Sequence, residues 1–86
     1  MGKVDKTLEK VLRGNADASI AFRDLCSLLR HLKFDERIRS DHHIFTREGV
    51  REILNLQPRG SKAKPYHVKQ VREIIVAYQL AGELES

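Results

Sequence analysis

Histidines are the residues of this sequence best suited to move protons near neutral pH, because imidazole titrates there. The chain has 4 histidines, of which His42 and His43 are adjacent. Alternating residue types around them predict a β-strand, and adjacent strand residues point to opposite faces. The two rings therefore cannot bind one metal ion together, and we consider them for separate roles.

The position of the helices decides which of these two histidines is accessible. Phe45 shares a strand face with His43, and Ile44 shares one with His42. If helices cover the Phe45 face, His43 is partly buried and His42 is open; the opposite arrangement exchanges them. A strand histidine can also be purely structural, and the residue pattern alone leaves that alternative open.

An accessible histidine at the start of a strand suits cleavage of RNA. It can take the proton from a ribose 2′-hydroxyl or give one to the leaving 5′-oxygen. Nearby cations would stabilise charge that develops on the phosphate. The candidates for that role are Arg37, Arg39, Lys62 and Lys64. This chemistry needs no metal ion, and the ligand spacings typical of zinc sites do not occur; we expect no cofactor.

Positive charge is concentrated in one segment of a chain whose formal net charge is +4. No acid occurs between Pro58 and Arg72. The bases of this segment are Arg59, Lys62, Lys64, Lys69 and Arg72. Such a segment attracts RNA or an acidic protein partner, although a solvated lysine-rich loop has the same composition. Tyr66, within it, either stacks on a base or packs against the protein.

The spacing of apolar residues predicts one α+β domain over residues 1–86, in the order α-α-β-β-β-α. The expected architecture is a three-stranded antiparallel sheet with helices packed on one face. The predicted elements are helices over residues 4–12 and 22–32, strands over 34–39, 42–47 and 53–57, a polar loop over 58–64, and a helix that begins at Pro65 and ends at Gly82.

Three further features limit the function. Cys26 lies on the apolar face of the second helix, so we assign it to the core; a single cysteine also excludes an internal disulfide. Lys64 stands where the last helix would carry a capping side chain, which leaves N–H groups for phosphate or for water. No apolar run approaches the length of a membrane span, so we expect no membrane partner and a cytoplasmic location.

From Leu32-Lys33-Phe34 through Ser40-Asp41-His42-His43-Ile44-Phe45, the sequence resembles the HicA-type toxin family of bacterial toxin–antitoxin systems. The resemblance continues through Pro65-Tyr66-His67 and residues 68–75. It covers roughly residues 20–82 and leaves residues 1–19 as an N-terminal helical extension. In the family motif, a glycine and a small polar residue precede the catalytic histidine, which places His42 at the catalytic position.

The resemblance implies a double-stranded-RNA-binding-like fold, metal-independent cleavage of mRNA, and neutralisation by a HicB-type antitoxin. With His42 as the catalytic residue, the RNA-binding candidates are Arg37, Arg39, Ser40, His43, Arg59, Lys62, Lys64, Tyr66 and Lys69. A non-catalytic RNA-binding module of the same fold is the alternative. A DNA-binding helix-turn-helix is disfavoured because the first two helices are separated by more than a short turn.

The sequence departs from the family at two positions that are usually glycine. Lys33 stands before the aromatic residue that opens the first strand, and Ser40 stands two places before His42. If Lys33 ends the helix in the left-handed conformation, lysine costs roughly 1 kcal/mol relative to glycine. Ser40 would either obstruct the RNA backbone and lower activity, or donate a hydrogen bond to phosphate.

Overall fold

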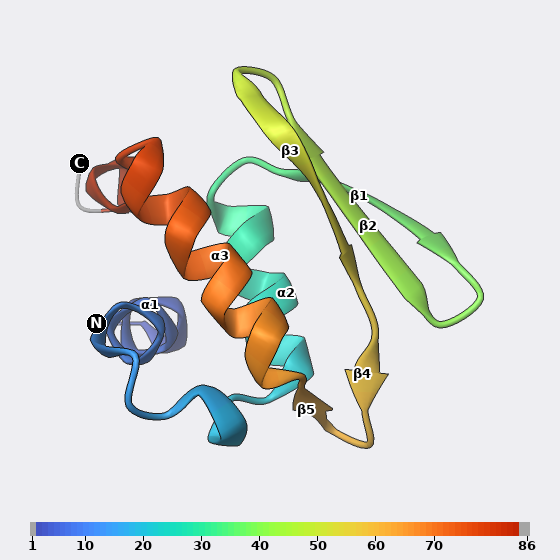
Figure 1. The fold of residues 1–86 in the computed structure, drawn as a ribbon. Helices are drawn as coiled ribbons and strands as arrows, with labels where there is room; N and C mark the ends of the chain where they lie inside the picture. The colour runs from blue at the N-terminus through green and yellow to red at the C-terminus, as the bar shows by residue number, and fades with distance from the viewer. Residues whose placement is uncertain (1, 85–86) are drawn as a thin grey trace.

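The structure is a computed structural model that describes residues 2–84. Its elements are α1 (Lys3–Arg13), η1 (Asp17–Ser19), α2 (Phe22–His31), β1 (Asp35–Arg39), β2 (His42–Arg47), β3 (Val50–Leu56), β4 (Pro58–Arg59), β5 (Lys62–Ala63), α3 (Pro65–Ala77) and η2 (Leu80–Leu84). Strands β1, β2 and β3 form an antiparallel sheet, with the helices on one of its faces (Figure 1). The predicted α+β class is confirmed.

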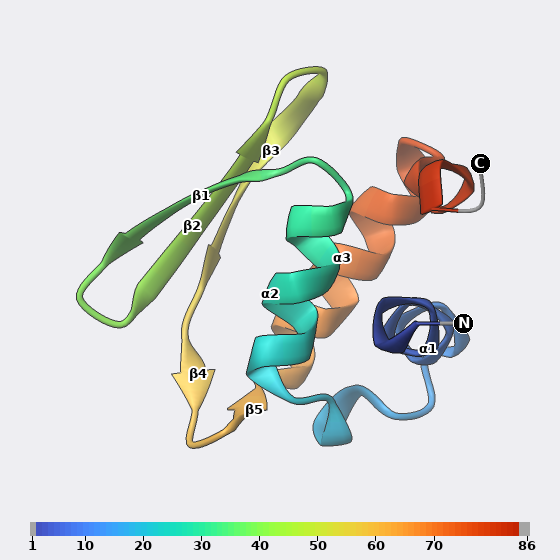
Figure 2. The same cartoon turned by 180° about the vertical axis from the view of Figure 1, so that it is seen from behind.

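Residue alternation along the strands explains why helices cover one face of this sheet. Phe45, Leu54 and Leu56 are fully buried, whereas Ile44 and Asn55 pair across the strands on the opposite face. Helices α2 and α3 pack on the buried face, and α1 packs on their far side, away from the sheet (Figures 1 and 2). The Ile44 face remains uncovered by the helices.

The N-terminal segment shares the core of the rest of the chain. Leu8 and Val11 of α1 belong to the same buried cluster as the apolar residues of α2 and α3. The Arg72 guanidinium of α3 donates to the Val11 carbonyl oxygen at 3.1 Å and forms an ion pair with Asp17 at 2.9 Å. Through these contacts, the segment predicted as an N-terminal extension packs against α3. No helix within residues 2–84 is both long and apolar enough to cross a membrane.

Two boundaries near β3 differ from the prediction. The strand begins at Val50 instead of residue 53, because Gly49 adopts a φ of 91° and allows the chain to reverse directly after β2. The predicted polar loop over 58–64 contains the short strands β4 and β5, which pair with each other. Gly60, between them, has a φ of 60°. Glycine at both turns permits this tighter path.

The predicted end of the last helix at Gly82 was wrong. Helix α3 ends at Ala77, and Gly82 lies within η2. Tyr78 follows the helix, and its hydroxyl donates to Glu52 at 2.8 Å and accepts from the Arg51 backbone N–H at 3.2 Å. Gln79, the next residue, has a φ of 55°, a left-handed conformation that ends the helix and that the apolar spacing of α3 does not reveal.

Both positions at which the family usually has glycine adopt a left-handed backbone conformation. Lys33, directly after α2, has a φ of 71°, and the N–H of Phe34 donates back to the Leu29 carbonyl. Ser40 has a φ of 55° in the two-residue turn between β1 and β2. The left-handed conformation considered for Lys33 is therefore observed, and Ser40 has a positive φ as well.

Replacing Lys33 with glycine is expected to raise the free energy of unfolding by about 0.5–1 kcal/mol, because the left-handed conformation disfavours a Cβ atom. Denaturant unfolding followed by circular dichroism would measure the change. The matched control is Lys10→Gly within α1, which should destabilise the protein by a similar amount. Equal destabilisation by both substitutions would contradict the assignment of strain to Lys33.

Candidate functional site

His42 begins β2 on the uncovered face of the sheet, and 45% of its side chain is exposed. Asn55 of β3 holds the ring, with Oδ1 at 3.0 Å from His42 Nδ1. A carbonyl oxygen can only accept, so Nδ1 carries the proton of the neutral ring and Nε2 keeps its lone pair. The arrangement leaves His42 Nε2 as a proton acceptor.

A series of hydrogen bonds connects the turn before His42 to the start of α3. Asp41 Oδ1 lies 3.8 Å from His42 Nε2. Gln57 Nε2 donates to Asp41 Oδ2 at 2.7 Å, and Lys64 Nζ donates to Gln57 Oε1 at 3.1 Å. The Gln57 hydrogen bond, with smaller effects of His42 and Lys64, lowers the pKa of Asp41. Asp41 therefore stays ionised beside His42.

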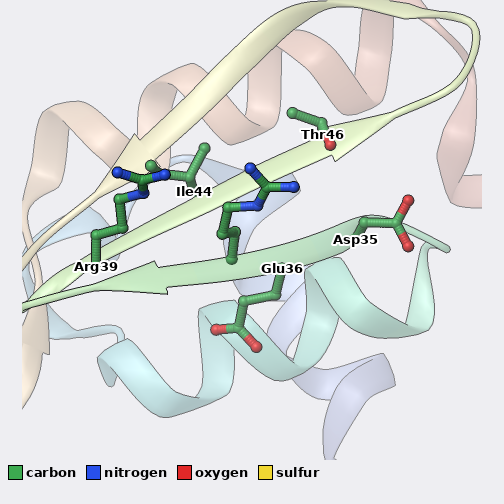
Figure 3. A pocket seen from close by; sticks show the side chains of 6 residues that line it. Asp35, Glu36, Arg39, Ile44 and Thr46 are labelled. Carbon is green, nitrogen blue, oxygen red and sulfur yellow. The ribbon is translucent and has the colours of Figure 1, made fainter.

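Arg37 and Arg39 of β1 lie on the same sheet face as His42. Arg39 pairs directly with His42, and Arg37 pairs with Ile44; direct cross-strand partners share a face. Both arginines line a hollow of about 600 Å³ over β1 and β2. Figure 3 shows Arg39, Ile44 and Thr46 on this side, whereas Glu36 points toward the helices. The two guanidinium groups place positive charge on the sheet face that carries His42.

A second hollow, of about 350 Å³, joins His42 to the start of α3. Tyr66, in the first turn of α3, is 62% exposed. The residues that line this hollow are His42, Ile53, Asn55, Gln57, Tyr66, His67 and Gln70. Sequence analysis identified His42 and Tyr66 but missed the three amide side chains, Ile53 and His67. Alternation in β3 places Ile53 and Asn55 on one face, but the β2–β3 register was needed to bring them to His42.

The start of α3 has the uncapped form that the sequence predicts. Lys64 is the N-cap residue and makes no side-chain cap hydrogen bond. His67, in the first turn, is 5% exposed, and its Nδ1 has no hydrogen-bond partner among the described residues. Burial, followed by the nearby Lys64 charge, lowers the pKa of His67. His67 is therefore neutral near pH 7.

His43 lies on the opposite face of the sheet, against the helices. Its side chain is 21% exposed, and Nδ1 lies 2.7 Å from Glu36 Oε2. Phe22 of α2 meets the ring edge-on, with centroids 4.9 Å apart. Of the two arrangements considered for the histidine pair, the structure has the one with His42 open and His43 partly buried. The sheet separates His43 from His42, with which we grouped it as an RNA-binding residue.

Glu36 connects His43 to α2. Arg30 donates two hydrogen bonds to its carboxylate, at 2.7 and 3.1 Å. The bond from Arg30, followed by that from His43, lowers the pKa of Glu36. Donor atoms of Cys26, Glu36 and His43 lie within 4.8 Å of one another. Because burial raises the pKa of Cys26 to about 12 and Arg30 occupies Glu36, we interpret this group as structural.

None of the predicted bases lines the hollow that contains His42. Arg59 and Lys62 pair across β4 and β5, and Lys69 is exposed on α3. Lys64 reaches the site through Gln57. Of the predicted bases, Arg37, Arg39 and Lys64 therefore have the most direct connection with His42.

No protein-family model, curated protein or solved structure matches the chain.

Replacing Ser40 with glycine is expected to stabilise the protein by about 0.5–1 kcal/mol, because the serine has a positive φ in a hairpin turn. If the serine side chain also obstructs the RNA backbone, the rate of RNA cleavage rises in the same variant. Unfolding and cleavage assays measure the two effects separately. A faster cleavage rate without stabilisation would contradict the strain assigned to Ser40.

Proposed function

We propose that this protein is a metal-independent endoribonuclease of the HicA toxin type, with His42 as the general acid/base. The observation that carries the proposal is the geometry of His42. Asn55 fixes its Nδ1, its Nε2 is free to accept a proton, and Arg39 stands directly opposite on the same open face. An antiparallel sheet with helices on one face also supports a double-stranded-RNA-binding-like fold.

In the proposed reaction, His42 Nε2 removes the proton of a ribose 2′-hydroxyl. The 2′-oxygen attacks the adjacent phosphorus, and the bond from phosphorus to the 5′-oxygen breaks. The leaving 5′-oxygen takes a proton from water, so that the products are a 2′,3′-cyclic phosphate and a 5′-hydroxyl end. Arg37 and Arg39 stabilise the charge that develops on the phosphate, and Asp41 stabilises the imidazolium.

The proposed substrate is mRNA in the cytoplasm, and the proposed protein partner is a HicB-type antitoxin. The bases of the β4–β5 segment and α3 support RNA binding through phosphate contacts. An acidic antitoxin surface would suit the same positive region. The antitoxin part of this proposal loses its support if a co-purifying acidic partner neither shields His42 nor lowers activity.

A cleavage assay with purified protein tests the reaction. Single-stranded RNA is incubated with the protein in the presence of a metal chelator, and the new ends are analysed chemically. Cleavage that continues with the chelator and gives cyclic-phosphate ends is the expected result. RNA that stays intact, or cleavage that the chelator abolishes, would contradict the proposal.

One observation favours a second candidate function, a non-catalytic RNA-binding module. Asp41, 3.8 Å from His42, stays ionised because its pKa is lowered, so it does not supply the proton that the leaving oxygen needs. A binding module would bind RNA with a steep dependence on salt concentration but would release no cleaved ends. The same assay, combined with a salt titration of binding, separates the two functions.

A further inference from the structure

We propose that the hollow between His42 and the start of α3 binds one unpaired nucleobase of an RNA strand, next to the phosphate at which the RNA is cleaved. The hollow has a volume of about 350 Å³ and is lined by residues of β2, β3 and α3. This inference rests on the proposed function, because it names the form of RNA that the site takes.

Exposed apolar and aromatic groups provide the surfaces on which a base would stack. Tyr66 and Ile53 line the hollow and are 62% and 64% exposed. Large side chains this exposed gain little from the protein itself. Aromatic side chains stack readily on unpaired bases, whatever the base identity. Tyr66 also lies against the His67 ring, with centroids 4.2 Å apart, which restricts its position.

Polar groups in the same hollow can meet the edge of a base. Gln70 lines the hollow, and the structure gives its side-chain amide no hydrogen bond within residues 2–84. Asn55 accepts through Oδ1 from His42, which leaves its NH₂ group as a donor. The amide groups of Gln70 and Asn55 can therefore pair with complementary groups on the edge of a base.

The size and the surroundings of the hollow favour a single unpaired nucleotide. Pockets for small ligands measure about 300–1,000 Å³, so this hollow is at the lower end of that range. Lys64 donates through Nζ to Gln57, which lines the hollow, and its charge would favour the phosphate of the same nucleotide. In a duplex, base faces are stacked on one another and are closed to Tyr66.

Binding of uncleavable RNA to Tyr66 variants tests this inference. The probe is a fluorescent single-stranded RNA with 2′-fluoro riboses, which lacks the attacking hydroxyl, and its affinity is measured by anisotropy. Tyr66→Ala is expected to weaken binding about 5- to 150-fold, the range found for loss of one stacked base. Tyr66→Phe keeps the ring and should retain affinity. Val76→Ala, an equally exposed position of α3 outside the hollow, is the matched control.

A duplex of the same modified RNA provides the second measurement, and its affinity should be unchanged by Tyr66→Ala. The inference is overturned if Tyr66→Ala binds the single strand like the parent, or if it weakens both forms equally. The nuclease proposal fails separately. If the parent protein cleaves no RNA but Tyr66→Ala weakens single-strand binding, the nuclease proposal fails and the base site stands. If the parent cleaves RNA but Tyr66→Ala binds it with unchanged affinity, the base site fails and the nuclease proposal stands.

Discussion

Replacing His42 with alanine is expected to lower the rate of RNA cleavage by about 10²- to 10⁴-fold, the contribution typical of a positioned acid/base group. The loss follows from the removal of Nε2, the proton acceptor that Asn55 leaves free by binding Nδ1. Because His42 lies on the open sheet face with much of its side chain exposed, the substitution should leave the fold intact. Single-turnover cleavage of a defined RNA measures the effect, with circular dichroism as the check on folding.

His31→Ala is the matched control for this substitution. His31 is also an exposed histidine, but its Nδ1 lies 2.8 Å from the Ser27 carbonyl oxygen within its own helix. Its position in the last turn of α2 suits the structural role that we assign to it. We expect parental cleavage from this variant. Equal cleavage by His42→Ala and His31→Ala would rule out His42 as the acid/base.

Replacing Glu36 with alanine is expected to lower the free energy of unfolding by about 1.5–3 kcal/mol, the usual cost of losing hydrogen bonds to a charged group. Glu36 is 14% exposed and holds Arg30 through two hydrogen bonds and His43 through one. Its removal leaves both partners without their acceptor at the contact between β1 and α2. Urea unfolding at neutral pH measures the change.

Glu9→Ala is the control, because Glu9 forms an ion pair with Arg13 at the surface of α1 and both side chains are largely exposed. Such a pair contributes only about 0.3–0.5 kcal/mol. If Glu9→Ala costs as much as Glu36→Ala, the connection between Arg30, Glu36 and His43 has no special role in stability.

The same carboxylate predicts how stability depends on pH. Hydrogen bonds from Arg30 first, and from His43, hold the pKa of Glu36 below its usual value of 4.5. A depressed pKa in the folded state stabilises the protein above the usual value and loses that contribution as pH falls through the folded pKa. Glu36→Gln should therefore lose less stability than the parent between neutral and acidic pH. Urea unfolding at a series of pH values compares the two.

Much of the fold could be predicted from the sequence because local patterns determine it. The period of two around His42 and His43 located β1 and β2, and Pro65 marked the first residue of α3. The positive φ at Ser40 follows from the position of the residue in a two-residue hairpin turn. The end of α3 could not be predicted in this way, because Gln79 adopts a φ of 55° although its residue type does not signal a helix end, and Tyr78 contacts Glu52, 26 residues away in sequence.

The candidate site could be predicted only in part, for a similar reason. His42 was identified from its type and its strand position. Its partner Asn55 is 13 residues further along the chain, and their contact depends on the register between β2 and β3. His67 and Gln70 join them because the start of α3 lies beside β3, an arrangement that helix packing determines.

The hydrogen bonds that link Asp41, Gln57 and Lys64 also affect the entropy of binding. They connect the hairpin turn next to His42 to Lys64, the N-cap residue of α3, before any ligand is present. When a ligand contacts both elements, the protein then loses less conformational freedom on binding than two independent loops would. This preorganisation also helps to keep the imidazole close to its reactive position, so that less of the binding energy is needed to place it there.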